Sequence, residues 1–292
     1  MKCSVIIPTC HRNDALSLCL DRLAPGRQTL DSSEYDVIVT DDGTRSTAEA
    51  MVRQKYPWAR WVAGPRKGPA ANRNNGTRFA NGDWLAFTDD DCLPSPAWLA
   101  AFFAAGVPGI DVLEGKTTCE QGIRSDLEEA PVNLTGGAFP SCNLMVRRAT
   151  FDRLGRFDED FPFWCEDQYF HTLVRRAGVG KRFVPDAVID HPRRRRPSGW
   201  QMGLRWEARI LLWYKEGNVS SVWTFFPLHC LKVRVSQNLK HPLQWDTVRA
   251  AFSIAAEMIC LVTHLNEWDR KYRAFGPARQ TSGSRRLNVG AQ

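Results

Sequence analysis

The 292-residue sequence lacks the short motifs that would assign it to several common enzyme classes. No G-x-G-x-x-G follows the first predicted strand, which removes the main support for a dinucleotide-binding domain. H-E-x-x-H and G-x-S-x-G are also absent, so the sequence carries neither a zinc-protease helix nor a nucleophile elbow. The nine cysteines show no C-x-x-C or zinc-ligand spacing, and reduced thiols are therefore expected.

Long uncharged hydrophobic segments are lacking too. The most apolar stretch, residues 250–265, is interrupted by Glu257 and is shorter than the roughly 18–20 uncharged residues that a membrane crossing needs. The sequence begins directly in a β-rich segment, without the basic and apolar regions of a signal peptide. We therefore expect a cytoplasmic protein.

Charge is distributed unevenly along the chain. The formal net charge is +7, but residues 1–192 carry 22 basic and 26 acidic side chains, whereas residues 193–292 carry 17 and 6. Six of the eleven tryptophans lie in the basic part. This asymmetry indicates a nearly neutral catalytic body with a C-terminal part that seeks an anionic surface.

Short β-branched runs alternate with helical patterns in the first half of the chain. The runs typical of strands are 4–7, 35–40, 61–63 and 83–88, and the helical patterns are 14–23, 46–56 and 69–79. Such alternation favours an α/β fold with a parallel sheet flanked by helices. Folds of this kind bind ligands at the carboxyl ends of their strands.

The pattern changes near residue 195, within a run of four arginines. We expect one domain over residues 1–195, a mostly helical basic module over 196–275, and a disordered tail over 276–292. The arginine run itself fits either a solvated loop or a basic segment that contacts phosphates or anionic lipid.

Three adjacent carboxylates, Asp89, Asp90 and Asp91, directly follow the predicted strand at 83–88. Like charges this close repel one another unless a cation compensates them. If the strand geometry persists, Asp89 and Asp91 point to the same side, where their oxygens suit Mg²⁺ or Mn²⁺. A solvated acidic turn is the alternative that the residues alone leave open.

Two further acidic pairs stand at the ends of predicted elements. Asp41 and Asp42 end the strand at 35–40, where acidic residues are common in turns. Glu166 and Asp167 precede a helical run and follow an aromatic segment. A carboxylate there is either a helix cap or, beside apolar rings, a general base whose pKa is raised by burial.

Taken together, these residues resemble family 2 glycosyltransferases of the GT-A fold over roughly residues 3–192. The segments that carry the resemblance are SVIIPT at 4–9, VTDDGT at 39–44, RNNG at 73–76, GDWLAFTDDD at 82–91, GG at 136–137, CNLMVRR at 142–148 and ED at 166–167. The resemblance implies a Rossmann-like mixed sheet flanked by helices that binds a nucleotide-sugar, followed here by a mostly helical C-terminal extension.

The resemblance also implies a role for each matching residue. The residues expected to bind the nucleotide are Pro8, Thr9, Asp41, Arg73, Asp89 and Asp90. Those expected to hold Mn²⁺ or Mg²⁺ are Asp91, Asp89 and His191, although a lone histidine before proline also fits a structural role. Asp167 is expected to be the catalytic base with Glu166 beside it, and the acceptor is expected near Gly136, Gly137, Asn143 and Trp164.

The expected reaction is transfer of a single sugar, with inversion, to a hydroxyl of a glycan or a lipid-linked acceptor. The expected donor is a UDP- or dTDP-sugar, and a GDP-sugar is the less favoured donor. Processive relatives carry Q-x-x-R-W, but Gln201 to Trp206 has one residue more. Basic residues mixed with tryptophans beyond residue 196 favour peripheral contact with an anionic membrane, at the inner face of the plasma membrane, over nucleic-acid binding. A nucleotidyltransferase and a non-catalytic nucleic-acid-binding protein are the two alternatives.

Overall fold

The computed structural model describes residues 2–161, 163–218, 222–240 and 245–275, with no side-chain description at 224 and 225. The tail expected at 276–292 lies outside these residues. The chain divides into two compact units. Unit 1 comprises residues 1–123 and 128–194, and unit 2 comprises residues 124–127 and 195–292. The short segment 124–127, expected in the first domain, belongs to unit 2.

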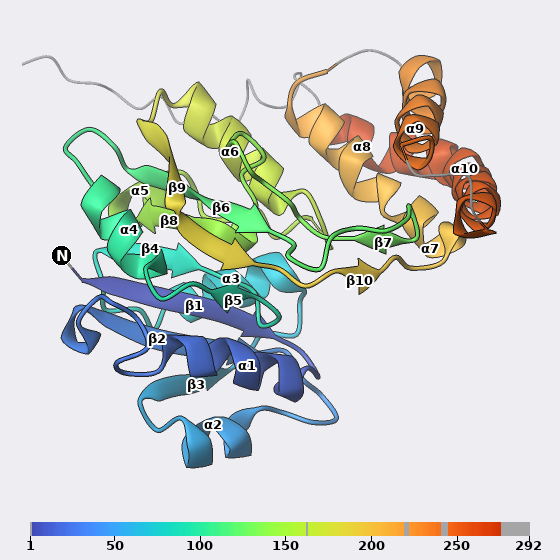
Figure 1. The fold of residues 1–292 in the computed structure, drawn as a ribbon. Coiled ribbons are helices and arrows are strands. Elements are labelled where there is room, and N and C mark those ends of the chain that lie inside the picture. The colour runs from blue at the N-terminus through green and yellow to red at the C-terminus, as the bar shows by residue number, and fades with distance from the viewer. Residues whose placement is uncertain (1, 162, 219–221, 241–244, 276–292) are drawn as a thin grey trace, which may run out of the picture. The chain divides into compact units, whose positions relative to one another are not determined.

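Unit 1 is built on a mixed eight-stranded sheet with helices packed against it (Figure 1). Its strand order is β3-β2-β1-β4-β8-β6-β9-β5. The strands are β1 (Cys3–Thr9), β2 (Tyr35–Asp41), β3 (Ala59–Ala63), β4 (Trp84–Phe87), β5 (Leu93–Pro94), β6 (Val112–Thr118), β8 (Leu144–Arg147) and β9 (Lys181–Asp190). Two-residue strands β7 (Glu128–Glu129) and β10 (Arg194–Arg195) form a separate pair.

The N-terminal half of the sheet is parallel, as the alternation of strands and helices predicts. β1 pairs in parallel with both β2 and β4, and every residue of β1 is buried. A central strand covered on both faces favours the continuous apolar run Val5–Ile7. β8 runs antiparallel to β4 and β6, so the complete sheet is mixed. The carboxyl ends of β1, β2 and β4 therefore meet at one edge.

The helices of unit 1 bury one side against this sheet. They are α1 (Asn13–Leu23), α2 (Glu49–Lys55), α3 (Pro69–Thr77), α4 (Trp98–Ala105), α5 (Arg148–Arg153) and α6 (Glu166–Arg176). Short 3-10 turns occur at Ser32–Glu34 and Ser141–Asn143. α3 is almost wholly buried and begins after Gly68, whose φ of 94° only glycine adopts readily, followed by Pro69 in the first turn. This helix carries Arg73 into the interior.

Unit 2 is helical and consists of α7 (Gly199–Leu204), α8 (Trp206–Lys215), α9 (Val222–Asn238), α10 (Trp245–Tyr272) and a 3-10 turn at Arg273–Phe275. Ser198 and Gln201 form a capping box at the start of α7. The helix from Trp245 to Phe275 has the length and apolar composition of a membrane span, although the sequence analysis expects none. Only 33% of the most apolar 18 residues of this helix are buried.

Candidate active site

A cavity of about 560 Å³ opens at the carboxyl edge of the sheet in unit 1. It receives residues from the ends of β1, β4 and β9 and from the starts of α3 and α6. Many of the residues expected at the site line it, namely Pro8, Thr9, Arg73, Asp89, Trp164, Glu166, Asp167 and His191. The topology thus brings together side chains from five sequence segments, as expected for the carboxyl ends of strands.

The three aspartates after β4 point in different directions. Asp89 is partly exposed to the cavity, and Asp91 contacts Arg12 and His191. Asp90 is fully buried, where its carboxylate accepts hydrogen bonds from Thr9 Oγ1 at 2.6 Å and from Arg12 Nε at 3.1 Å. Burial raises the pKa of Asp90 to about 7, although Arg12 opposes the shift. Asp90 therefore anchors the loop and does not line the cavity, contrary to its expected contact with the nucleotide.

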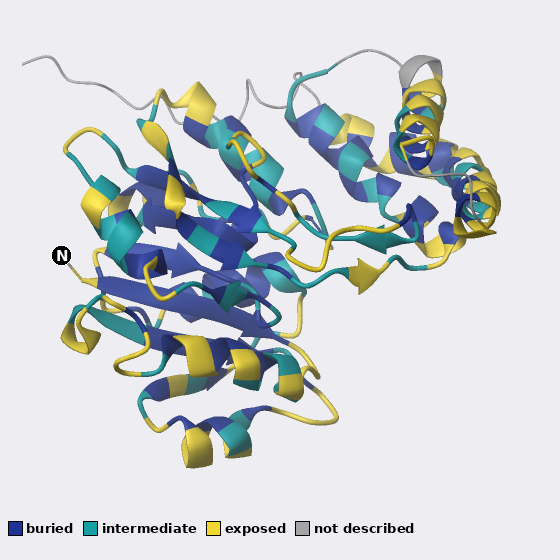
Figure 2. Cartoon of the chain, in the orientation of Figure 1, coloured by how far each residue is buried: buried dark blue, intermediate teal, exposed yellow. Residues whose placement is uncertain are grey.

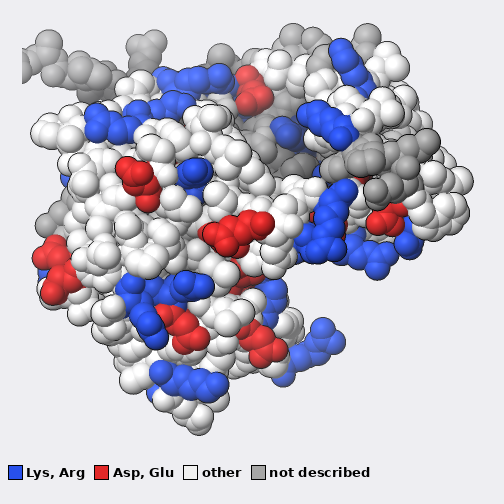
Figure 3. Space-filling model, in the orientation of Figure 1, with Lys and Arg blue, Asp and Glu red and all other residues white. Residues whose placement is uncertain are grey.

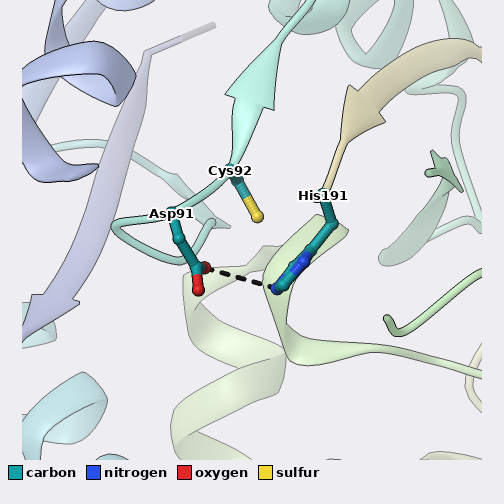
Figure 4. A group of neighbouring side chains, drawn as sticks. All are labelled: Asp91, Cys92 and His191. Carbon is teal, nitrogen blue, oxygen red and sulfur yellow. Dashed lines mark ion pairs between the residues drawn. The ribbon is translucent and has the colours of Figure 1, made fainter. Parts of the chain in front are cut away.

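Asp91 and His191 form a pair with the properties of a metal site (Figure 4). His191 Nε2 lies 3.3 Å from Asp91 Oδ1, and His191 Nδ1 is 2.9 Å from the carbonyl oxygen of Pro192. Because a carbonyl oxygen only accepts, Nδ1 is the donor in this contact, and Nε2 is the ring atom that faces Asp91 and would offer its lone pair to a metal ion. Asp91 Oδ1 is buried without a hydrogen-bond donor. A divalent cation fits two such facing lone pairs.

Cys92 is the third potential ligand, since its sulfur lies within 4.8 Å of the ligand atoms of Asp91 and His191. Figure 4 shows its side chain directed toward the space between them. Burial raises the pKa of the Cys92 thiol well above its ordinary value. Mn²⁺ and Mg²⁺ prefer oxygen ligands, so the Asp91 carboxylate suits both ions better than the thiol does, and the His191 imidazole is more compatible with Mn²⁺ than with Mg²⁺.

Arg73 joins the two acidic elements at the floor of the cavity. Its Nη2 donates to Asp89 Oδ1 at 2.6 Å and its Nη1 donates to Glu166 Oε1 at 2.8 Å. Although burial acts in the opposite direction, Arg73 holds the pKa of Asp89 below its usual value. Burial, with the neighbouring charge of Asp167, raises the pKa of Glu166 to about 7.

Asp167 stands beside Glu166 in the first turn of α6 and faces the cavity. One carboxylate oxygen accepts from the backbone N–H of Ser141 at 3.2 Å, and the other accepts from that of Gln168 at 2.8 Å. Burial raises the pKa of Asp167 above its ordinary value, which makes its carboxylate a better proton acceptor. Cys165 adopts a left-handed conformation with φ of 74°, and the chain turns there into α6.

Asp41 does not reach the cavity. Its two oxygens accept hydrogen bonds from the backbone N–H of Gly43 at 2.8 Å, that of Ala48 at 2.6 Å, and Trp61 Nε1 at 3.2 Å. Asp42 lines the cavity instead and accepts from the backbone N–H groups of Arg66 and Gly68. The carboxylate of Asp41 thus holds the loop after β2, and its expected contact with the nucleobase stays a prediction.

The residues expected at the acceptor lie in different places. Trp164 lines the cavity, whereas Gly136 and Gly137 line a separate pocket of about 180 Å³ with Glu114. Asn143 is fully buried, where its amide accepts from Trp98 Nε1 and donates to the carbonyls of Lys116 and Ala187. Asn143 thus ties α4 to the sheet and cannot touch an acceptor.

Arg12 is a main residue of the site that was not expected from the sequence. Its Nη1 donates to Asp91 Oδ2 at 2.7 Å, and its Nη2 lies 2.5 Å from Asp90 Oδ1. Its position three residues beyond the end of β1, at the carboxyl edge, is a signal that could have identified it. Asp42, Ser141, Cys142 and Arg194 also line the cavity.

Comparisons with known proteins assign the fold and the enzyme class. Residues 4–105 match the family described as glycosyl transferase family 2. Mannosyltransferase PcManGT from Pyrobaculum calidifontis, solved with GDP-Man and Mn²⁺, superposes with a TM-score of 0.55 at 20% identity, over 94% of this chain and 83% of that chain. Residues 1–349 of S. aureus TarS, solved with UDP, superpose with a TM-score of 0.54 at 19% identity, over 99% and 94%.

Curated relatives are glycosyltransferases as well. AglE of Haloferax volcanii is 26% identical over 206 residues, which cover 65% of this chain and 67% of AglE. Poly(ribitol-phosphate) beta-glucosyltransferase of Bacillus spizizenii is 32% identical over 122 residues, which cover 40% of this chain and 19% of that protein. Validoxylamine A glucosyltransferase of Streptomyces hygroscopicus is 27% identical over 207 residues, 55% of this chain and 45% of that protein. The match spans less than half of the last two.

The curated relatives make this chain a glycosyltransferase, and the solved structures give it a GT-A-type fold. Its residues 4–105 match glycosyl transferase family 2. These matches favour a glycosyltransferase over the two alternatives, a nucleotidyltransferase and a nucleic-acid-binding protein.

Proposed function

We propose that this glycosyltransferase moves a single sugar, with inversion, from a nucleotide-sugar to a hydroxyl acceptor in the synthesis of a surface polysaccharide or glycolipid. We further propose that it works in the cytoplasm, at the inner face of the plasma membrane. The observation that carries the proposal is the single cavity that contains Arg73, Asp89, His191 and Asp167.

On the donor side, one carboxylate is available to the nucleobase, and a cation site is available to the diphosphate. Asp42 presents an acceptor that suits the ring N–H of uracil or thymine, and also that of guanine. Asp91 and His191 would hold Mn²⁺ or Mg²⁺, which when bound offsets the charge of the departing nucleoside diphosphate. Asp89 lies in the same cavity, close to Arg73.

The acceptor side of the cavity contains the catalytic base, Asp167, and the aromatic side chain of Trp164. Asp167 takes the proton from the acceptor hydroxyl as its oxygen bonds to the anomeric carbon, while the bond to the diphosphate breaks on the opposite face. One carboxylate suffices for a single inverting displacement. Glu166 keeps Arg73 in place and hydrogen-bonds the acceptor, and Trp164 provides an apolar surface for a sugar ring.

The supporting comparisons concern relatives. PcManGT was solved with GDP-Man and Mn²⁺, and TarS with UDP. A further relative is named GalNAc(5)-diNAcBac-PP-undecaprenol beta-1,3-glucosyltransferase, from Campylobacter jejuni, whose acceptor is a lipid-linked glycan by its name. These relatives make a nucleotide-sugar donor and a lipid-linked acceptor reasonable choices for assay.

The test is a donor panel. UDP-, dTDP-, GDP- and CDP-sugars are incubated with Mn²⁺ and an extract of lipid-linked glycans, and released nucleoside diphosphate is measured. We expect release with one base only, most readily UDP or dTDP, and a product whose anomeric configuration is opposite to that of the donor. A retained configuration in the NMR spectrum of the product would refute the single displacement.

A further inference from the structure

Unit 2 exposes many large apolar side chains on its two long helices. Figure 2 colours much of α9 and α10 as exposed. We define the apolar face as Leu228, Leu231 and Val235 of α9 and Leu239 in the turn that follows it, together with Trp245, Val248, Phe252, Ile259 and Val262 of α10. Within each helix the intervals are three, four or seven residues, which keeps these side chains on one side of that helix at 3.6 residues per turn. Trp245, Phe252 and Leu239 are 74%, 73% and 74% exposed.

The opposite side of α10 belongs to the core of unit 2 and contains the only acidic group in the middle of this helix. Between Ala250 and Asn266, Glu257 is the only Asp, Glu, Lys or Arg, and it is fully buried. Its carboxylate accepts from Trp206 Nε1 at 2.8 Å and from Arg234 Nε at 2.9 Å. The outer side of this stretch is therefore free of these charges. The ion pair between Glu257 and Arg234 of α9 holds one side of α10 against the rest of unit 2. The exposed side of α10 is therefore suited to lie along the surface of a bilayer.

A basic cleft adjoins the apolar face. This arginine cleft, of about 420 Å³, is lined by Arg195, Arg196 and Arg249 and by the uncharged residues Leu127, Pro197, Ser198, Gly199 and Ser253. Ser253 directly follows Phe252 of the apolar face. Of these arginines, Arg196 pairs with buried Asp126 at 3.3 Å, and Arg249 lies 3.8 Å from exposed Asp246. Among the described residues, no ion pair is recorded for Arg195.

The charge pattern identifies the occupant. Arginines bind phosphate oxygens through paired N–H groups, and anionic headgroups at a bilayer surface supply such phosphates. Figure 3 shows basic side chains outnumbering acidic ones among the charged groups visible on unit 2. A second copy of the chain in a two-fold arrangement would instead bring its own arginines toward these, and like charges disfavour that contact.

We propose that unit 2 docks on an anionic phospholipid bilayer, with the apolar face entering the boundary between headgroups and acyl chains and the arginine cleft holding headgroup phosphates. The apolar face and the arginine cleft would then be the part of the protein that contacts the inner face of the plasma membrane. This inference does not depend on glycosyl transfer, since neither the face nor the cleft belongs to the cavity of unit 1. The exposed tryptophans Trp223 and Trp245 fit the preference of indole rings for the membrane interface.

The test is sedimentation of the full chain with vesicles of phosphatidylcholine alone or mixed with phosphatidylglycerol. We expect binding to the mixed vesicles at low salt. The double variant Phe252→Ser/Ile259→Ser should weaken this binding at least tenfold at both low and high salt. Arg195→Gln and Arg249→Gln should each weaken it about fivefold at low salt only. Leu18→Ser and Arg53→Gln, at exposed positions of unit 1, should bind as the wild type does.

Four outcomes would overturn the proposal. These are no sedimentation of the wild type with mixed vesicles, full binding by the Phe252/Ile259 variant, and complete competition by millimolar inorganic phosphate, which would make the cleft a site for free phosphate. The fourth is a dimer in sedimentation velocity that Phe252→Ser dissolves. Circular dichroism of each variant reports its folding. Binding of UDP, measured in parallel, separates failure of this proposal from failure of the proposed donor.

Discussion

Arg73 Nη2 donates to Asp89 Oδ1 at 2.6 Å and thereby joins α3 to the loop that follows β4. The same guanidinium reaches Glu166 at the start of α6, so three segments of the active site share one buried cation. This geometry connects the donor side of the cavity with the catalytic carboxylates. The folded shape of the site therefore depends on charge compensation as well as on apolar packing.

Replacing Arg73 by glutamine leaves Asp89 and Glu166 without their buried counter-charge. We expect Arg73→Gln to lower the free energy of unfolding by about 3–5 kcal/mol, the usual cost of removing one partner of a buried ion pair. Urea denaturation measures this change. Arg53→Gln breaks an exposed pair with Glu49 on α2, and its free energy of unfolding should change by less than about 0.5 kcal/mol. Equal stability of the two variants would contradict the account.

Asp41 and Asp42 are adjacent but should respond differently to substitution. Asp41→Asn disturbs hydrogen bonds from three N–H donors, two of them buried, so we expect the free energy of unfolding to fall by about 1–3 kcal/mol. Asp42→Asn alters a carboxylate that lines the cavity, so we expect nucleotide affinity to fall about tenfold with a smaller loss of stability. Isothermal titration and thermal unfolding of both variants distinguish the two roles. If Asp41→Asn lowered the nucleotide affinity and Asp42→Asn lowered the stability, Asp41 would be the residue that contacts the nucleobase.

The raised pKa of Glu166 predicts a pH dependence of stability. Burial places the pKa of this group at about 7, above its ordinary value of 4.5, so the folded state binds the proton more tightly. The free energy of unfolding should consequently fall as the pH rises from about 4.5 to 7, by a few kcal/mol at most. Glu166→Gln removes this contribution, and its urea midpoint should fall less over that range than the wild-type midpoint. Glu49→Gln, at an exposed position of α2, is the control.

Asp167→Asn tests the base without changing the shape of the side chain. We expect nucleotide affinity to remain and transfer to fall by about 10²–10⁴, the usual contribution of a positioned general base. Initial rates with the active donor measure the loss. Asp186→Asn, at an exposed position of β9, should transfer at the wild-type rate. Near-normal turnover by Asp167→Asn would remove this residue from the mechanism.

Local patterns in the sequence foresee the sheet and most of the cavity, for a physical reason. The β-branched runs that become β1 and β2 are buried along their carboxyl halves, which is typical of a parallel sheet with helices on both faces. Because parallel strands end at the same edge of a sheet, the residues that follow them lie close together. Thr9 and Asp89 stand at such strand ends, which the sequence marks clearly. Asp167 stands instead at the start of α6, and only the resemblance to family 2 glycosyltransferases assigns it to the same site.

The direction of individual side chains was harder to foresee. Asp41 and Asp42 differ only in which of them meets the N–H groups of Gly43 and Ala48, and a turn conformation decides this. Asp90 points inward because Thr9 and Arg12 offer it donors from another strand end. Asn143 is held by Trp98, 45 residues away in the chain. Such long-range partners leave no periodic signal in the sequence.

The central claim is that Asp91 and His191 hold a divalent cation that couples to binding of a nucleoside diphosphate. Isothermal titration of UDP, dTDP and GDP, with Mn²⁺ and with EDTA, tests it most directly on wild type, Asp91→Asn, His191→Gln and the control His229→Gln. We predict that one nucleotide binds at least tenfold more tightly with Mn²⁺ in the wild type and the control, and that both site variants lose this difference. Equal affinity with Mn²⁺ and EDTA in the wild type, or an unchanged metal effect in Asp91→Asn, would contradict the claim.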